Sequence, residues 1–305
     1  MRLLVLSDAD VRGLLPMDEC IEAMDRVLRE LARGELHQPL RFFTRPPGAE
    51  SLFGFMPAHR GGERPAWSLK EIVVTPGNPA VRGLDAHQGG ILLHDGETGE
   101  LRALLNASAV TEIRTAAVSA VATRALARPG ARTVAIVGAG VQARSHVESM
   151  RAVLGEVELR TWSRRDGGTA EEAVRGADVV CTCTSSREPV LRLDWLAPGA
   201  HVNAIGASVP TARELDEQTV AAATLVVDRR ESALNEAGEL LVPGFGEERI
   251  AAELGEVLVG SHPGRTAETE LTVFKSLGLA VEDLAAAELI VARAREQGVG
   301  TEVEF

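Results

Sequence analysis

The chain has 305 residues, 45% of them hydrophobic, and its formal net charge at pH 7 is −12. This length allows about two domains, and the acidic balance argues against nucleic acid or an anionic membrane as the main partner. No apolar run approaches the ~18 residues that a membrane-spanning helix needs. The three cysteines lack a Cys-x-x-Cys spacing and the apolar run 3–6 is too short for a signal-peptide core, so we expect a cytoplasmic protein without a bound metal.

The first part of the chain predicts a sheet flanked by helices. A strand at 2–6 is followed by Ser7 as a helix cap and by a helix at 17–33 whose apolar residues recur on one face. A helix at 108–127 ends at Pro129-Gly130. Between these helices, short runs broken by Pro and Gly predict an antiparallel or mixed sheet with strands at 40–44, 52–56, 67–75, 90–94 and 101–105.

The most informative motif follows the strand predicted at 133–137. Gly138, Gly140 and Ala143 occupy the first, third and sixth places of the dinucleotide-binding fingerprint. The first glycine allows a tight turn, the second lets the backbone approach a pyrophosphate, and the small third residue lets the helix at 141–153 pack on the strand. The free N–H groups at the start of that helix suit phosphates, although the same pattern can mark an ordinary strand, turn and helix.

Beyond the fingerprint the pattern alternates between strands and helices. Residues 166–176 leave room for one short helical segment only, whereas a parallel crossover needs at least ~10–12 residues before another strand can begin. We therefore expect one edge strand of the dinucleotide fold to be absent. The predicted strands are 157–162, 178–184, 201–205 and 225–228, and the predicted helices are 231–237 and 281–296.

Three polar residues after the second strand of this region indicate which cofactor binds. At this place an acidic side chain would accept a hydrogen bond from the ribose 2′-hydroxyl of NAD and repel a 2′-phosphate. The chain instead has Ser163, Arg164 and Arg165, which suit the phosphate of NADP. The alternative is two solvated arginines on the surface, since Arg is abundant in this chain. NADP(H) is thus the expected cofactor, with NAD(H) possible.

Two features of the composition bear on chemistry. The chain has no Tyr, which excludes the Tyr-x-x-x-Lys chemistry of short-chain dehydrogenases. Of the 32 Lys and Arg residues, only Lys70 and Lys275 are lysines, and the rest are arginines. A chain so biased toward Arg keeps Lys where a compact ammonium must lose its proton or fit a small pocket. Lys70 could still be a solvent-facing strand residue, and Lys275 could simply pair with a carboxylate.

Several short segments, spread over most of the chain, are informative when they are taken together. They are QPLR at 38–41, MPA at 56–58, the strand with Lys70, RTAAVSA at 114–120, GAGVQA at 138–143, PGAHVNAIGAS at 198–208, ELD at 214–216 and VFKSLG at 273–278. Together these segments resemble the ornithine cyclodeaminase and mu-crystallin family over about residues 38 to 285. The resemblance is closest to the mu-crystallin branch, whose members reduce cyclic ketimines with NAD(P)H.

The resemblance implies an α/β fold with two domains in a homodimer. A Rossmann-type domain at 118–278 would be inserted in an α+β substrate-binding and dimerisation domain made of 1–117 and 279–305. Arg41 and Arg114 would bind the carboxylate of the substrate, and Lys70 would lie beside its reacting carbon and nitrogen. A guanidinium fork suits a carboxylate, and a lysine next to a nicotinamide can act as an acid or a hydrogen-bond donor.

The remaining site residues are also implied by the resemblance. Met56, His87 and Ser208 match positions around the substrate, although a pocket-wall or core role is as consistent for Met56 and His87. Arg41 could be a surface strand residue, whereas Arg114 lies on an apolar helix, where an unpaired charge would be costly. The cofactor would be lined by Thr115, Gly138, Gly140, Val141, Gln142, Ser163, Arg164, Arg165, Thr184, Gly206, Phe274 and Ser276.

The expected function is the reduction of a small cyclic 2-imino acid, such as pyrroline-2-carboxylate or piperideine-2-carboxylate. The alternatives are an alanine-type amino-acid dehydrogenase, an ornithine cyclodeaminase and a crystallin-like binding protein. In the cyclodeaminases the position matching Ser208 is an aspartate that does acid–base work on the substrate. A serine hydroxyl without a partnering base cannot take up a proton near neutral pH, so Ser208 argues against the cyclodeaminase.

Overall fold

The computed structural model describes residues 2–305, which form two compact units. Unit 1 comprises residues up to Arg114 together with Leu279–Phe305, and unit 2 comprises Thr115–Gly278. The division falls within the long helix α4 (Ala107–Leu126) and directly before the helix α11 (Ala280–Gln297). The boundaries predicted from the sequence lie at 117/118 and 278/279. No helix among residues 2–305 is long and apolar enough to cross a membrane.

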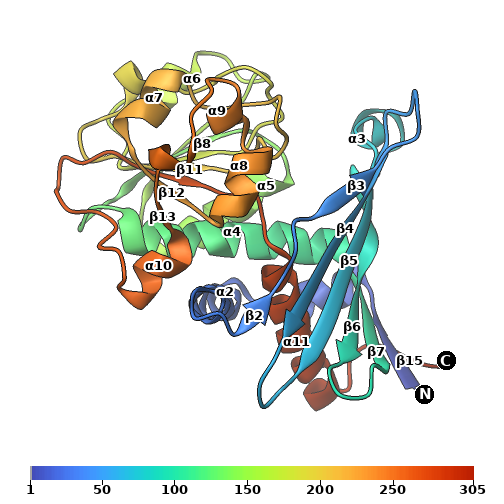
Figure 1. The fold of residues 1–305 in the computed structure, drawn as a ribbon. Coiled ribbons are helices and arrows are strands. Elements are labelled where there is room, and N and C mark those ends of the chain that lie inside the picture. Colours follow the sequence, from blue (N-terminus) through green and yellow to red (C-terminus); the bar gives the residue numbers. More distant parts are fainter. Residues whose placement is uncertain (1) are drawn as a thin grey trace. The chain divides into compact units, whose positions relative to one another are not determined.

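Unit 1 is built on a mixed sheet of eight strands (Figure 1). Its strands are β1 (Arg2–Leu6), β2 (Leu36–His37), β3 (Phe42–Thr44), β4 (Leu52–Arg60), β5 (Ala66–Val74), β6 (His87–Asp95), β7 (Leu101–Asn106) and β15 (Thr301–Glu304). They lie in the order β15-β1-β7-β6-β5-β4-β2, with β3 also paired to β4. β1 is parallel to β7, and the other neighbours are antiparallel. The predicted mixed sheet is therefore confirmed.

Helix α11 covers one face of this sheet, where it packs against β4, β5, β6 and α2. The other helices of unit 1 are α1 (Asp8–Leu14), α2 (Met17–Ala32), the short α3 (Asn78–Val81) and the first part of α4. Side chains alternate between the faces of a strand. Met56, Lys70 and Ile91 are register neighbours on the face toward α11 and are buried, whereas Trp67 and Val73 are exposed.

Strand β4 extends through Pro57, a residue type that ends most strands because it cannot donate a hydrogen bond to a neighbour. β5 pairs with β4 along its whole length. On the other side, β3 pairs only with residues 53–55 and β2 only with 59–60. Among the described residues no strand pairs with β4 at Pro57 on that side, so the missing N–H leaves no ladder bond unmade. The strand therefore extends four residues beyond its predicted end at Met56.

Unit 2 is built on a sheet of seven parallel strands. Its strands are β8 (Thr133–Val137), β9 (Glu158–Trp162), β10 (Val179–Thr182), β11 (His201–Ala204), β12 (Thr224–Val227), β13 (Ile250–Glu253) and β14 (Thr272–Lys275). They lie in the order β13-β12-β14-β11-β10-β8-β9, so β9 forms the predicted edge. The helices are the rest of α4, α5 (Val141–Leu154), α6 (Ala170–Val174), α7 (Glu217–Ala222), α8 (Arg230–Glu236), α9 (Gly238–Leu241) and α10 (Leu254–Val259).

Several short elements were not predicted from the sequence, among them β13, β14, β15 and α1. Strands β13, β14 and β15 have four residues each, too few for a reliable period, and β14 ends in Lys275. Helix α1 has seven residues, and Ser7 caps this helix rather than α2, with its hydroxyl accepting from the backbone N–H of Asp10. The chain then turns at Pro16 before α2 begins.

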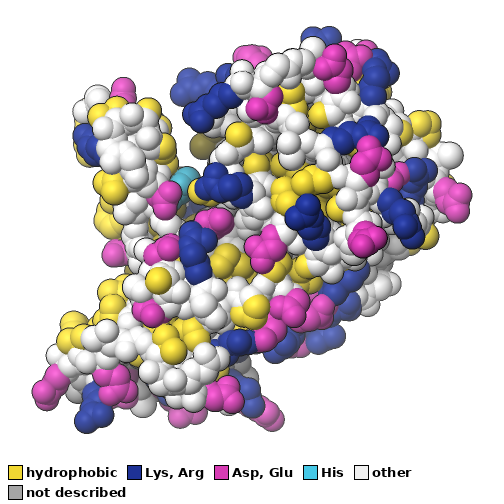
Figure 2. All heavy atoms as spheres, turned by 180° about the vertical axis from the view of Figure 1, so that it is seen from behind, with side chains coloured by type: hydrophobic (Ala, Val, Ile, Leu, Met, Phe, Trp, Pro, Cys, Tyr) yellow, Lys and Arg dark blue, Asp and Glu magenta, His cyan; other side chains and the backbone are white. Residues whose placement is uncertain are grey.

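The surface carries charges of both signs. On the face drawn in Figure 2, side chains of Lys and Arg are interspersed with those of Asp and Glu. On this face neither sign of charge gathers in one extended area.

Candidate functional site

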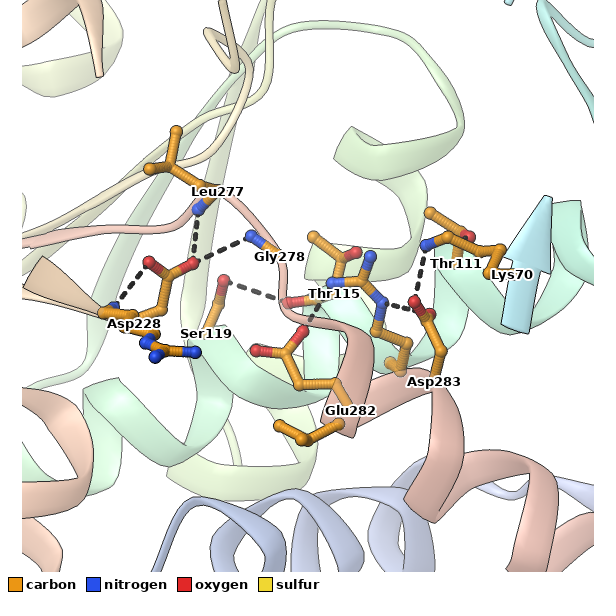
Figure 3. A network of polar contacts seen from close by, with 12 residues as sticks. Lys70, Thr111, Thr115, Ser119, Asp228, Leu277, Gly278, Glu282 and Asp283 are labelled. Carbon is orange, nitrogen blue, oxygen red and sulfur yellow. Dashed lines mark hydrogen bonds and ion pairs between the residues drawn. The ribbon is translucent and has the colours of Figure 1, made fainter. Parts of the chain in front are cut away.

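Lys70 is the centre of a buried group of charges in unit 1. It lies on β5, opposite Met56 of β4, with its side chain 2% exposed. Its Nζ lies 2.7 Å from Oδ2 of Asp283 on α11 and 3.5 Å from Oγ1 of Thr111 on α4 (Figure 3). A strand and two helices therefore meet at one ammonium group, and the solvent-facing alternative for Lys70 is excluded.

Arg114 joins the same group through α4. Its Nε donates to Oδ1 of Asp283 at 3.1 Å, and its Nη1 donates to Oε2 of Glu282 at 2.6 Å. All three side chains are almost completely buried. The two oxygens of Asp283 thus contact two different cations, Lys70 and Arg114. The buried charge of Arg114 is compensated, as the apolar character of α4 requires.

Burial lowers the pKa of Lys70 to about 8, because an ammonium group loses its hydration there. The carboxylate of Asp283 opposes this shift, while the positive charges of Arg114 and Arg41 add to it. A lysine of this kind is protonated at neutral pH and can still release its proton readily. General acid catalysis needs such a group.

Arg41, Met56 and His87 occupy the same face of the sheet. Arg41 directly precedes β3 and its guanidinium carbon lies 5.3 Å from the centre of the Phe43 ring. Met56 is buried opposite Lys70, and His87 is an exposed residue at the start of β6, opposite Val74. Since Val74 and Lys70 are four residues apart on β5, His87 shares the face of Lys70.

The fingerprint of unit 2 has the geometry of a phosphate-binding turn. Gly138 has φ 140°, and an added Cβ would collide with the carbonyl oxygen of Cys183. A Cβ on Gly140 would meet no heavy atom within 4 Å among the described residues, so packing alone does not require glycine there. Gly140 is the N-cap of α5 and has no side chain to cover the free N–H groups of this helix. The open space and the helix start fit a pyrophosphate.

The loop after β9 contains Ser163, Arg164 and Arg165, which are expected to bind the cofactor. Ser163 is buried, and its N–H donates to Oδ2 of Asp166 at 2.7 Å. Arg164 is exposed and donates from Nη2 to Oγ of Ser186 at 2.8 Å. Arg165 is exposed as well. The carboxylate of Asp166 therefore binds the backbone of its own turn, while the guanidinium of Arg164 is oriented by Ser186.

The other expected cofactor residues differ in exposure. Val141 is exposed, and Gln142, Thr184, Gly206 and Ser208 are partly exposed. Thr115, Phe274 and Ser276 are buried, Phe274 completely. The N–H of Ser276 donates to the carbonyl of Ala204, and the carbonyl of Thr115 accepts from the hydroxyl of Ser119. Lys275 pairs with Glu239 at 3.4 Å, so its simpler interpretation, pairing with a carboxylate, is confirmed.

Sequence reasoning missed Asp283 and Glu282, which hold Lys70 and Arg114. Both acids lie in the first turn of α11. The helix dipole favours acidic residues there, so their position does not indicate a site. It also missed what Gln38 does. The side-chain oxygen of Gln38 accepts from the N–H of Val281 at 2.9 Å and so caps α11, whose N-cap Leu279 has no side-chain acceptor.

Comparison with known proteins identifies the family. A model of the ornithine cyclodeaminase/mu-crystallin family matches residues 1–171 and 167–298. The chain belongs to the ornithine cyclodeaminase/mu-crystallin family. It is 41% identical over 273 residues to the ketimine reductase mu-crystallin of Mus musculus, covering 84% of this chain and 85% of the mouse protein.

Two solved structures are similar to this protein over almost the whole chain. The Δ1-pyrroline-2-carboxylate reductase of Thermococcus litoralis, in complex with NADH and L-proline, is 35% identical with a TM-score of 0.89 and covers 98% of this chain and all of its own. An archaeal alanine dehydrogenase, a dimer with bound NAD, is 32% identical with a TM-score of 0.94 and full coverage of both chains. The predicted fold class is therefore confirmed.

The buried charges of unit 1 predict that two arginines contribute very differently to stability. Arg114 lies on α4, and Arg12 pairs with Glu112 of the same helix. Arg114→Met leaves Glu282 without its cation and leaves Asp283 with Lys70 alone, so the free energy of unfolding should fall by about 3–5 kcal/mol. Arg12→Ala removes partly exposed pairs with Asp8 and Glu112 and should cost at most about 1 kcal/mol. Urea unfolding of both variants measures the difference. Equal losses would show that the Arg114 group is as well hydrated as the surface pairs.

Proposed function

We propose that this protein reduces small cyclic 2-imino acids, such as pyrroline-2-carboxylate or piperideine-2-carboxylate. Like its ketimine reductase and pyrroline-2-carboxylate reductase relatives, it is an NAD(P)H-dependent oxidoreductase acting on C=N bonds. The observation that carries the choice of substrate is the charge group of unit 1. Lys70, with a pKa of about 8, lies on one sheet face with Arg41 near it and Arg114 beside it.

The charges of unit 1 suit a substrate with a carboxylate. Arg114 and Arg41 both lie close enough to Lys70 to act on its pKa, so three cations gather in this part of unit 1. A guanidinium fork among them suits the carboxylate of an imino acid. Arg41, which is partly exposed on the Lys70 face, is the cation best placed to meet it, with Arg114 behind.

The proton comes from the same group. The Lys70 ammonium donates its proton to the imine nitrogen, which makes the imine carbon a better hydride acceptor. The reduced nicotinamide dinucleotide, when bound, supplies the hydride to that carbon. The product is then the cyclic amino acid, and Lys70 regains a proton from water. Asp283 keeps the ammonium charged and directed, because its Oδ2 lies 2.7 Å from Nζ.

In this proposal unit 1 holds the imino acid and unit 2 holds the cofactor. The fingerprint turn at Gly138 and Gly140 and the N-terminus of α5 would receive the pyrophosphate. Thr184 and Gly206 follow β10 and β11 at the carboxyl edge of the parallel sheet, where ligands of such sheets bind. Ser208, four residues after β11, takes the place of the cyclodeaminase aspartate and offers no base.

A substrate panel tests the proposed function. The protein should oxidise NADPH or NADH with pyrroline-2-carboxylate and piperideine-2-carboxylate, and more slowly or not at all with pyruvate and ammonia. The second mixture tests alanine dehydrogenase, which the likeness to the archaeal enzyme favours as the second candidate. Ornithine with catalytic NAD⁺ should release no ammonia over multiple turnovers. Sustained ammonia release, or activity only with pyruvate and ammonia, would contradict the proposal.

The pKa of Lys70 sets the pH dependence of imine reduction. Since the protonated form is the active one, kcat/KM should fall as pH rises through about 8. In Asp283→Asn the attraction that raises this pKa is lost, so the fall should occur at a pH about 1–3 units lower. Glu282→Gln is the matched control, because Glu282 contacts Arg114 rather than Lys70. An unchanged profile in Asp283→Asn would exclude Lys70 as the proton donor.

The loop after β9 favours NADPH over NADH. Arg164 is held at a defined position by Ser186 rather than by a carboxylate, so its charge can serve a 2′-phosphate. The carboxylate of Asp166 is bound to the N–H of Ser163 and occupies its own turn. Both features distinguish the loop from one that binds a free ribose through an acidic side chain.

Arg164→Ala should weaken NADPH binding relative to NADH by about 1–3 kcal/mol, the value of one charge-assisted contact. Arg160→Ala is the control, since Arg160 lies on β9 but pairs with Glu158 and the carbonyl of Arg175. Dissociation constants for both cofactors, measured by fluorescence titration, give the preference. Equal constants for the two cofactors in the parent protein would remove the basis for the NADP assignment.

We also propose that the protein is a homodimer that pairs through the outer face of the unit 1 sheet. That face, opposite to α11, exposes Trp67 by 48% and Val73 by 40%. Phe53 and Phe55 of β4 lie on the same face, with their rings tilted at 49° and their ring centres 4.2 Å apart. An apolar area of this kind on a sheet is unusual on a monomer and suits an isologous contact between two copies. The archaeal alanine dehydrogenase is a dimer.

A further inference from the structure

Glu214 is a completely buried carboxylate in unit 2 for which the proposed reaction has no role. It belongs to the segment Glu214-Leu215-Asp216, which follows β11 and precedes α7. An ionised carboxylate without hydration is costly unless donors and cations surround it. The contacts of the Glu214 side chain therefore indicate its role.

Four donors converge on this carboxylate from two neighbouring strand ends. From the end of β10, the N–H and the hydroxyl of Thr184 both donate to Oε1 at 2.7 Å. The hydroxyl of Thr182 donates to Oε2 at 2.8 Å, and the N–H of Gly206, after β11, donates to Oε2 at 2.6 Å. Each carboxylate oxygen accepts two hydrogen bonds, which uses the acceptor sites of both oxygens. The carboxylate therefore links the end of β10 to the end of β11.

The two segments are packed as closely as their backbones allow. A Cβ on Gly206 would collide with the backbone O and N of Thr184 and with the Glu214 side chain itself. A Cβ on Gly138 would collide with the carbonyl of Cys183, directly before Thr184. The fingerprint turn, the end of β10 and the end of β11 thus fit against one another without room for an additional atom.

A cation on a third strand supports the carboxylate. Burial raises the pKa of Glu214, and the charge of Lys275 on β14 and the donors from Thr184 and Thr182 oppose this. The ammonium of Lys275 donates to the carbonyls of Ala204 and Ala207 on either side of Gly206 and pairs with Glu239. Glu239 in turn accepts from the N–H of Glu214 at 3.0 Å. The four donors and this ammonium offset part of the cost of burying the carboxylate.

The place of this cluster gives it a function. β9 and β10 lie on opposite sides of β8, so the strand order reverses at β8, and the carboxyl edge at that point is where open α/β sheets bind their ligands. We propose that Glu214 is a positioning residue for the cofactor, which fixes the N–H groups and side chains of the Thr184 and Gly206 segments against the fingerprint turn. This inference rests on the proposed use of a nicotinamide dinucleotide.

The same hydrogen bonds extend to Arg164. The hydroxyl of Thr184, which donates to Glu214, accepts from the N–H of Ser186 at 3.2 Å. The hydroxyl of Ser186 accepts from Arg164 at 2.8 Å and donates to the carbonyl of Glu188. Glu214 therefore orients, through Thr184 and Ser186, the arginine assigned to the 2′-phosphate. Its loss should affect NADPH binding more than NADH binding.

Glu214→Gln tests the proposal. A glutamine side chain has one acceptor oxygen and one NH₂ group, so in either orientation one backbone N–H, that of Thr184 or that of Gly206, faces another donor. The Kd for NADH should rise by about 10-fold or more, and that for NADPH further. In steady-state assays KM for the cofactor should rise more than kcat falls, while KM for the imino acid stays near the parental value.

Glu239→Gln is the matched control. It lies in the same buried cluster and contacts Lys275 and the N–H of Glu214, but it contacts neither Thr184 nor Gly206. It should lose stability to a similar extent in thermal unfolding while its Kd for NADH stays within about twofold of the parent. If Glu239→Gln weakens NADH binding as strongly as Glu214→Gln, or Glu214→Gln binds NADH like the parent, the positioning role is wrong.

Thr182→Val keeps the test decisive if Glu214→Gln does not fold. It removes one of the four donors without changing side-chain shape, so a folded variant should bind NADH about 2–5-fold more weakly. Parental affinity in this variant would also contradict the proposal. The failure of the proposed function has a different signature, because then the parent protein itself would bind neither NADH nor NADPH.

Discussion

Unit 1 depends on the carboxylate of Asp283, whose two oxygens separate and compensate two buried cations. Without it, the charges of Lys70 and Arg114 would repel each other in a region where water is excluded. The same residue fixes α11 against both β5 and α4, because each of its contacts comes from a different element. Buried ion pairs add little to stability compared with apolar packing, so this group is explained better by chemistry than by folding.

Unit 2 uses a buried carboxylate in a different way. Asp283 pairs with cations and so adjusts the pKa of a lysine, whereas Glu214 collects mainly neutral donors and so fixes the backbone. In both cases a residue that contacts no reactant determines the geometry of those that do. Such supporting residues must hold functional groups within fractions of an ångström, which explains why they are buried and make several polar contacts.

Local patterns were sufficient to predict the fingerprint, the long helices and most strands, because each has its own period or turn signal. Lys70 could be selected for its rarity, but its partner Asp283 lies more than two hundred residues away and resembles an ordinary acidic residue at a helix start. Glu214 sits in a loop without a period, and β14 is four residues long and contains a lysine. Contacts that only the three-dimensional arrangement creates leave no trace in spacing. For Arg114 the prediction was better, because a cation on an apolar helix is costly to bury without a partner. The structure shows its partners to be Glu282 and Asp283.

The place of β14 in the sheet has a consequence for synthesis on the ribosome. β14, at residues 272–275, lies between β11 and β12, which precede it by many residues in the chain. Until it emerges, the strands β9-β8-β10-β11 and the pair β12-β13 have no shared partner, and the hydrophobic edges of both remain open. The helix that covers the Lys70 face of unit 1 comes later still, at 280–297. Both units therefore wait for residues 272–297, and the nascent protein exposes two unfinished sheets to chaperones until these residues have been translated.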